Sequence, residues 1–169
     1  MTRKNDIEKV EQYRKAADQG DAAAQFFLGE CYAAGQGVAQ DDAEAVKWFR
    51  RAADQGYPAA QFTLGWRCQH GNGVAQDHAE ALKWYRAAAD QGYATAQYNL
   101  GLCYLDGQGA PKDVLLAYKW LHLAASQGGD KDAGERRDKL VTQMTQEQIR
   151  EAQKLSAEFV PKKTPTKSP

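Results

Sequence analysis

The sequence repeats itself every 36 residues, and this period restricts the possible folds more than any other feature. Three closely similar segments, AAQFFLG, AAQFTLG and TAQYNLG, recur at this distance. Residues 21–56 and 57–92 share 23 identities in 36 positions, and residues 57–92 and 93–128 share 15. Internal similarity at this period is typical of stacked arrays, in which one copy cannot bury its own apolar face and neighbouring copies bury it together.

Each copy carries the signals of two helices. The first helix is predicted to begin near Ala22, Pro58 or Ala94 and to end at a G-x-G segment, which suits a helix C-cap and turn. An i, i+4, i+8 stripe predicts its buried face, with the members Ala24-Leu28-Tyr32, Ala60-Leu64-Cys68 and Ala96-Leu100-Tyr104. A mid-helix glycine stands beside each stripe, at Gly29, Gly65 and Gly101. Because glycine costs ~1 kcal/mol relative to alanine there, we expect another backbone to approach it closely.

The second helix of each copy is predicted to begin at an aspartate and to end at a Gln-Gly pair. Asp41 and Glu44 have the spacing of a capping box, and the second copy repeats it. Alanines at i and i+7 flank a tryptophan at i+3, as in Ala45-Trp48-Ala52, and predict the buried face.

The array has recognisable ends. Residues 5–20 match only the second helix of a copy and are predicted to form a half-repeat. Residues 130–160 are predicted to be a C-terminal cap whose helix starts at Thr145 with Gln148 as its capping-box partner. The whole would be a single domain to residue 160, and residues 161–169 are expected to be disordered because they are polar and rich in proline.

Composition excludes several classes of function. The 22 basic and 22 acidic residues cancel, so the chain lacks the basic excess that drives most nucleic-acid binding. No apolar run suits a signal peptide or a membrane span, which predicts a cytoplasmic protein. The alternative is a periplasmic or secreted protein, if the gene product carries an export signal that has been removed from this sequence. The three cysteines, one per copy, are predicted to be small buried residues and not members of disulfides or of a zinc site. No cofactor or metal is expected.

The pattern A-x-A-Q-x-x-L-G-x-x-Y-x-x-G-x-G-V, with its later W-[FY] and Q-G, resembles the Sel1-like repeat, a relative of the tetratricopeptide repeat. The resemblance covers about 110 residues strictly. It implies a right-handed α-solenoid of antiparallel helix pairs and a scaffold or adaptor that binds proteins. Some exported, cysteine-rich relatives have been called β-lactamases or penicillin binders, but they carry paired cysteines within repeats, which this chain lacks.

The first helices of such an array line a concave surface, and positions two residues beyond the packing stripe point away from it. The candidate partner-binding residues are Phe26, Glu30, Phe62, Trp66, Gln69, His70, Tyr98, Leu102 and Asp106. Their chemistry varies between copies, as expected of a binding surface and equally of an unconstrained one. Trp66 is the most informative, because Glu30 and Leu102 occupy its position in the other copies. The groove is the favoured place for Trp66, whereas core packing is favoured for Phe26, Phe62 and Tyr98.

Two other functions remain as alternatives to a protein or peptide binder. A β-lactam-interacting hydrolase would need an activated nucleophile, yet none of the serines at 126, 156 and 168 has a lysine three residues later. An envelope protein that binds a ligand or self-associates is the other, although a monomer is the favoured state. The three histidines fall at different repeat positions and suggest surface residues rather than a metal site.

Overall fold

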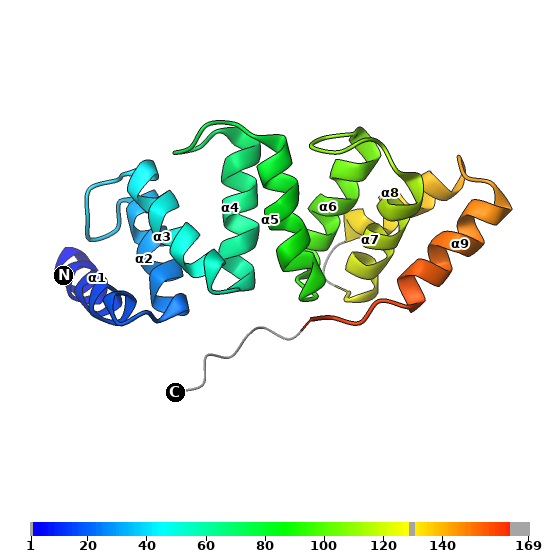
Figure 1. Ribbon diagram of the computed structural model, residues 1–169. Coiled ribbons are helices and arrows are strands. Elements are labelled where there is room, and N and C mark those ends of the chain that lie inside the picture. The colour runs from blue at the N-terminus through cyan, green and yellow to red at the C-terminus, as the bar shows by residue number, and fades with distance from the viewer. Residues whose placement is uncertain (1, 129–130, 163–169) are drawn as a thin grey trace. The chain divides into compact units, whose positions relative to one another are not determined.

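The computed structural model describes residues 2–128 and 131–162 of the chain. All regular elements in these ranges are α-helices, which confirms the all-α prediction. The backbone divides into two compact units, of which unit 1 ends at Asp77 and unit 2 begins at His78. The helices of unit 1 are α1 (Thr2–Asp18), α2 (Ala22–Ala34), α3 (Asp42–Asp54) and α4 (Pro58–His70) (Figure 1). Those of unit 2 are α5 (His78–Asp90), α6 (Ala94–Asp106), α7 (Val114–Ser126), α8 (Lys131–Val141) and α9 (Gln146–Ala157).

The first helices of the three copies begin and end where the sequence predicts. Helices α2, α4 and α6 start at Ala22, Pro58 and Ala94. Each ends at the first glycine of its G-x-G segment, whose N–H donates to the carbonyl four residues earlier; these glycines are Gly35, Gly71 and Gly107. Their φ angles of 66°, 74° and 77° lie in the left-handed region, which explains the choice of glycine.

The second helices of the first and third copies, α3 and α7, start with aspartate caps, but the capping box predicted at Asp41 forms only in part. The Asp41 carboxylate accepts the N–H of Glu44 at 2.9 Å, as a cap should. The Glu44 carboxylate instead pairs with the ammonium of Lys47 at 2.7 Å. In the third copy, Asp113 caps two N–H groups of α7, each at 3.0 Å.

The second glycine of each G-x-G segment holds its loop against a preceding helix. A Cβ on Gly37 would lie 2.5 Å from the carbonyl oxygen of Asp6 in α1. The same relation recurs 36 residues later between Gly73 and Asp42, and the carbonyl of His78 would obstruct a Cβ on Gly109. These glycines have φ near +70° as well, so both the backbone and the available space require glycine.

The mid-helix glycines accommodate a side chain where a backbone was expected. A Cβ on Gly29 would lie 2.7 Å from the ring of Phe49, and one on Gly101 would lie 2.9 Å from Cγ of Leu121. Phe49 and Leu121 are the same position of the second helix, and both are fully buried. The prediction of a close approach is therefore right, but it is mainly a large side chain that uses the space.

A buried glutamine joins successive copies, and the sequence analysis did not single it out. The side-chain amide of Gln25 donates to the carbonyl of Ala17 at 3.1 Å, in the last turn of α1. The corresponding bonds run from Gln61 to Ala53 at 3.1 Å and from Gln97 to Ala89 at 3.2 Å. Each of these carbonyls also accepts the N–H of a following glycine, so the glutamine supplies its second hydrogen bond. The side-chain oxygens of Gln25 and Gln97 in turn accept from Gln55 and Gln127, which forms a small polar network between copies.

The apolar core of unit 1 lies between its helices. Side chains from α1, α2 and α3 form one buried cluster, which consists of Val10, Ala17, Ala24, Leu28, Cys31 and Trp48. In unit 2 the predicted stripe of α7 is buried likewise, with Trp120 only 4% exposed. These predicted stripes therefore supply much of the interior of each unit, although in α5 the tryptophan of the stripe, Trp84, is only half-buried.

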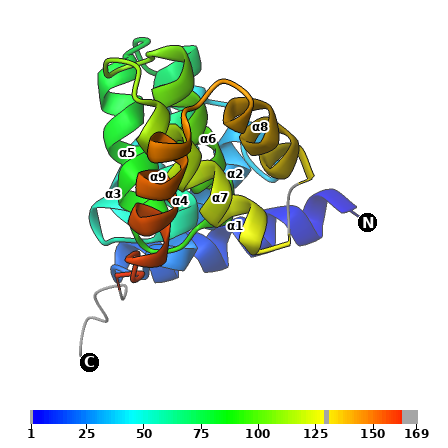
Figure 2. The same cartoon turned by 90° about the vertical axis from the view of Figure 1, so that its right-hand side faces the viewer.

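The chain ends differ from the prediction in two details and agree with it in a third. Helix α1 begins at Thr2, before the predicted half-repeat. The C-terminal segment contains two helices instead of one: α8, whose polar sequence gave no signal, precedes α9, and both pack on α7 (Figure 2). The predicted capping box of Thr145 and Gln148 is present at the start of α9.

The predicted disorder does not begin at residue 161. The N–H of Lys162 donates to the carbonyl of Asp90 at 2.7 Å, and its ammonium pairs with the carboxylate of Asp90 at 2.6 Å. Residues 163–169 lie outside the described residues.

Within the described ranges, no helix has both the length and the apolar character needed to cross a bilayer.

Candidate functional site

The predicted partner-binding residues fall into two groups by exposure. Those that are exposed are Glu30, Trp66, His70 and Asp106. Those that are half-buried are Phe26, Phe62, Gln69, Tyr98 and Leu102. Six of the nine lie on α2 and α4 of unit 1, and three lie on α6 of unit 2.

Trp66 and His70 form a stacked pair on the exposed side of α4. Their ring centroids are 4.4 Å apart with an interplanar angle of 29°. Nδ1 of His70 lies 2.8 Å from the carbonyl oxygen of Trp66, which can only accept, so this nitrogen carries the proton and donates. The indole is 39% exposed, although the imidazole covers part of it. The surface thus presents a large, oriented aromatic ring.

Phe26 packs within unit 1 more than it faces solvent. Its ring centroid is 5.7 Å from that of Phe49 in α3 and 5.4 Å from that of Tyr57, which precedes α4. Contacts at these distances and tilted angles are favourable aromatic pairs. This placement agrees with the preference for packing at this position.

Arg67, beside the stacked pair in sequence, is buried where the other copies have cysteine. Only 8% of it is exposed, and its guanidinium donates to the carboxylate of Asp42 at 2.7 Å and lies 5.2 Å from the ring centroid of Phe49. Partial burial raises the pKa of the Glu30 carboxyl, and the charge of Arg67 opposes this rise. Arg67 thus ties α4 to α3 and acts electrostatically on α2.

Phe27 is an exposed aromatic residue that the sequence analysis missed. It is 42% exposed, and its ring stacks on that of Tyr13 in α1 with centroids 5.4 Å apart. Thr63 and Asn99 occupy the same position in the other copies. The signal available in the sequence was this single replacement of a polar residue by phenylalanine.

In unit 2, helix α8 lies beside the predicted face of α6. Nε of Arg136 in α8 donates to the hydroxyl of Tyr98 at 3.0 Å. Leu105 and Asp106, at the end of α6, line a cavity of about 310 Å³ together with residues of α8. The polar sequence of α8 gives no helix signal, so this neighbour of α6 could not be predicted.

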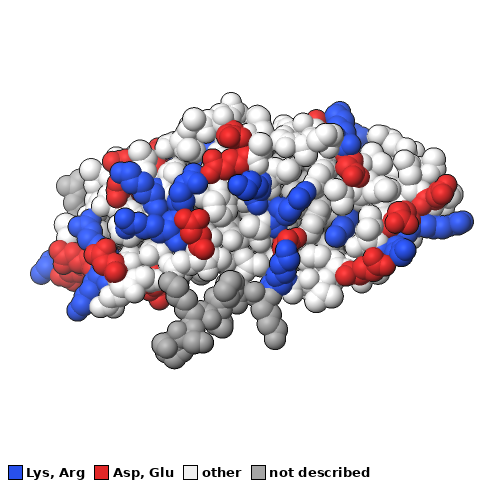
Figure 3. Space-filling view, in the orientation of Figure 1, with Lys and Arg blue, Asp and Glu red and all other residues white. Residues whose placement is uncertain are grey.

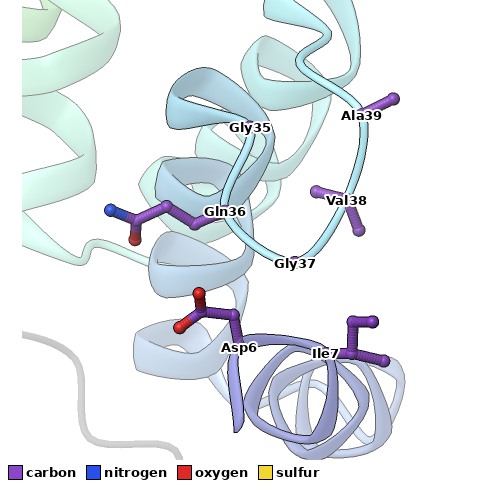
Figure 4. Close-up of a pocket in the computed structure, with 7 residues that line it drawn as sticks. All are labelled: Asp6, Ile7, Gly35, Gln36, Gly37, Val38 and Ala39. Carbon is purple, nitrogen blue, oxygen red and sulfur yellow. The ribbon is translucent and has the colours of Figure 1, made fainter. Parts of the chain in front are cut away.

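A larger cavity of about 520 Å³ opens in unit 1 between α1 and the loop after α2. Asp6 and Ile7 come from α1, and the other lining residues form the loop segment 35–39 (Figure 4). Among the lining side chains that the structure describes, Asp6 is charged and Gln36 is polar. The shape of the cavity follows from the close approach of Gly37 to the backbone of α1.

The surface charges and the cysteines do not indicate a reactive site in the described residues. On the face shown in Figure 3, Lys and Arg side chains are interspersed with Asp and Glu. All three cysteines are buried, and burial raises the pKa of the Cys103 thiol to about 11, with the Asp106 carboxylate acting in the same direction. Among the described residues, no group of three or more His, Cys, Asp or Glu side chains is placed to hold a metal ion.

Comparison with known proteins agrees with this architecture. The family model described as Sel1 repeat matches residues 13–21, 22–57, 58–93 and 94–129. The crystal structure of a Sel1 repeat protein from Oxalobacter formigenes is 42% identical, with a TM-score of 0.72, over 76% of this chain and 96% of that one. The crystal structure of a protective antigen of uropathogenic Escherichia coli, which displays an SLR fold, is 31% identical, with a TM-score of 0.69.

The second match covers 92% of this chain but only 41% of the antigen. No curated protein matches the chain. The two structural matches and the helix pairs of each unit bear out the predicted α-solenoid class.

Proposed function

Because the chain belongs to the Sel1 repeat family, we propose that it is a non-catalytic adaptor that binds a protein or peptide on the exposed faces of its first helices. Sel1 repeats generally serve as protein–protein interaction modules, and this general role applies to the chain. The finer proposal concerns where the partner binds. In unit 1 the face consists of the exposed residues of α2 and α4, centred on Trp66.

The observation that carries the proposal is the exposure of Trp66 at a position where the repeat needs no indole. Glu30 and Leu102 fill the same position in the other copies, so packing does not select tryptophan there. The stack on His70 at 4.4 Å restricts the indole before any partner arrives. An aromatic side chain that is already ordered loses little entropy on binding, and tryptophans of this kind are common energetic centres of interfaces.

The candidate residues of α6 extend the proposal to unit 2. Leu102 is half-buried and Asp106 is exposed, so both have surface to offer a partner. Tyr98 contributes less, because its hydroxyl already accepts a hydrogen bond from Arg136. In each unit the contact would therefore come from the middle and the last turn of the first helix.

A pull-down from the extract of the source organism tests this proposal. The wild type is compared with Trp66→Ala and with Ile7→Ala, a matched control because Ile7 is also an exposed apolar residue of unit 1, 48% exposed on α1. Retained proteins are identified by mass spectrometry, and circular dichroism verifies that each variant is folded. We expect one partner to be retained by the wild type and Ile7→Ala and lost by Trp66→Ala. Equal retention by all three proteins would place the interface elsewhere.

A further inference from the structure

A small cavity in unit 2 combines positive charge with an apolar lining. It lies between the end of α6, the loop before α7 and one side of α8, and it measures about 310 Å³. Its lining residues are Leu105, Asp106, Lys112, Arg136, Lys139, Leu140 and Gln143. A volume of this size is near the lower limit for small-molecule pockets and suits one or two amino-acid side chains.

Helix α8 presents one side to the cavity. Arg136, Lys139 and Leu140 are spaced i, i+3 and i+4, and Gln143 follows at i+7 just beyond the helix, so their side chains share one face. Leu140 is only 3% exposed and therefore belongs to the apolar base of the cavity. The hydrogen bond from Nε of Arg136 to Tyr98 fixes the guanidinium and leaves its terminal nitrogens as further donors.

The charges of the lining do not balance. Three cations, on Lys112, Arg136 and Lys139, face one carboxylate, on Asp106. In the described part of the chain, neither lysine ammonium forms an ion pair. Asp132 and Glu135 line an adjoining cavity together with Arg136 and Lys139, so the excess of two positive charges belongs to this lining alone. A concave lining with such an excess favours an anionic group.

The repeat frame does not require these residues. Gln40 and Gln76 stand at the position of Lys112 in the first two copies. Ala34 and His70 stand at the position of Asp106. The cationic residues of α8 lie outside the repeat altogether. Packing between copies therefore does not explain the presence of any charged residue in the cavity.

We propose that this cavity binds an acidic segment of a partner protein. A glutamate or aspartate carboxylate would lie among Lys112, Arg136 and Lys139, with a neighbouring apolar side chain against Leu105 and Leu140. Asp106 favours a peptide over a phosphate group, because its carboxylate repels a dianion yet accepts a backbone N–H. The inference rests on the proposed function, whose adaptor role it refines by naming the chemistry of the partner.

Titration with defined peptides tests the inference. The probe is a fluorescein-labelled octapeptide of alternating glutamate and leucine, and its binding to the full chain is followed by fluorescence anisotropy. The test variant is Lys112→Gln/Lys139→Gln. The first substitution restores the glutamine of the other copies, and the second changes an exposed side chain, so the fold should tolerate both. Lys154→Gln, an exposed lysine of α9, is the control with a charge change of the same kind.

We expect the double variant to bind the peptide roughly fivefold more weakly, as two partly exposed ion pairs imply. The control should bind like the wild type, and added salt should weaken both of them toward the level of the double variant. The inference is overturned if the peptide does not bind, if the double variant binds equally well, or if glutamine in place of glutamate leaves affinity unchanged. A phosphoserine peptide that binds more tightly than the glutamate peptide would overturn the choice of a carboxylate. Trp66 plays no part in this titration, so its outcome is independent of the pull-down that tests the adaptor role.

Discussion

Substitution of the two glycines after α4 separates the cost of backbone conformation from the cost of lost space. Gly71 and Gly73 both have φ of +74°. A Cβ on Gly71 would meet its nearest neighbour, Cβ of Gln76, at 3.4 Å, which is ordinary contact. A Cβ on Gly73 would lie 2.5 Å from the carbonyl carbon of Asp42 and closer still to its oxygen.

The magnitudes follow from these two environments. An alanine in the left-handed region costs about 1–2 kcal/mol at either site. Only at Gly73 must the loop also move away from the first residue of α3, and overpacking of this kind costs about 1–3 kcal/mol more. We therefore expect Gly71→Ala to lower the free energy of unfolding by about 1–2 kcal/mol and Gly73→Ala by about 2–5 kcal/mol.

Urea unfolding followed by circular dichroism measures both changes in the same chain. A difference of about 1 kcal/mol corresponds to several degrees in thermal midpoint for a unit of this size, so a thermal melt is an independent check. If the two variants differ by less than ~0.5 kcal/mol, the contact between Gly73 and Asp42 is not what selects glycine, and the reasoning fails.

Three further predictions follow from buried groups. Gln97→Leu removes both the bond to the carbonyl of Ala89 and the bond accepted from Gln127, and is expected to cost about 1–3 kcal/mol in urea unfolding; an unchanged midpoint would contradict the role given to this glutamine. Cys103 has a pKa of about 11, raised from 9.0, so its thiolate is scarce at pH 8 and Ellman's reagent should label it slowly in the folded chain and rapidly in urea. The pKa of His122 is lowered from 6.5 by burial and by the charge of Arg137, so the unfolded state binds this proton more readily. Stability should fall as pH decreases through and below 6.5, and His122→Phe should reduce that loss; an identical pH profile in the variant would refute this cause.

Much of the fold could be predicted because each local signal, such as a cap or a turn glycine, recurs in the three copies of the repeat. The G-x-G glycines, the cap at Asp41 and the helix start at Pro58 depend on neighbours within a few residues, and the structure confirms them. The role of Gln25 was missed, because its partner lies in the preceding copy and an isolated glutamine does not reveal a buried bond. Helix α8 was missed because, among its side chains that the structure describes, only Ala133 and Leu140 are buried.

The candidate site was less predictable, because its surroundings depend on segments outside the repeat. A helical wheel places Trp66 on the outer side of α4, and the structure finds it exposed. The wheel says nothing about what covers a face from outside the repeat. The approach of Arg136 to Tyr98, and the cavity beside Asp106, depend on α8, whose position no periodicity encodes. Phe27 was visible in the sequence, but only as a departure from Thr63 and Asn99.

The most direct test of the account is photo-crosslinking from position 66. A photoreactive phenylalanine analogue replaces Trp66 in one variant and Ile7 in another, and each is irradiated in extract of the source organism. The account predicts one discrete adduct from position 66 and not from position 7, suppressed by excess wild-type chain but not by excess Trp66→Ala. The same adducts from both positions, or equal suppression by both competitors, would contradict the claim that the exposed face of α4 binds a protein partner.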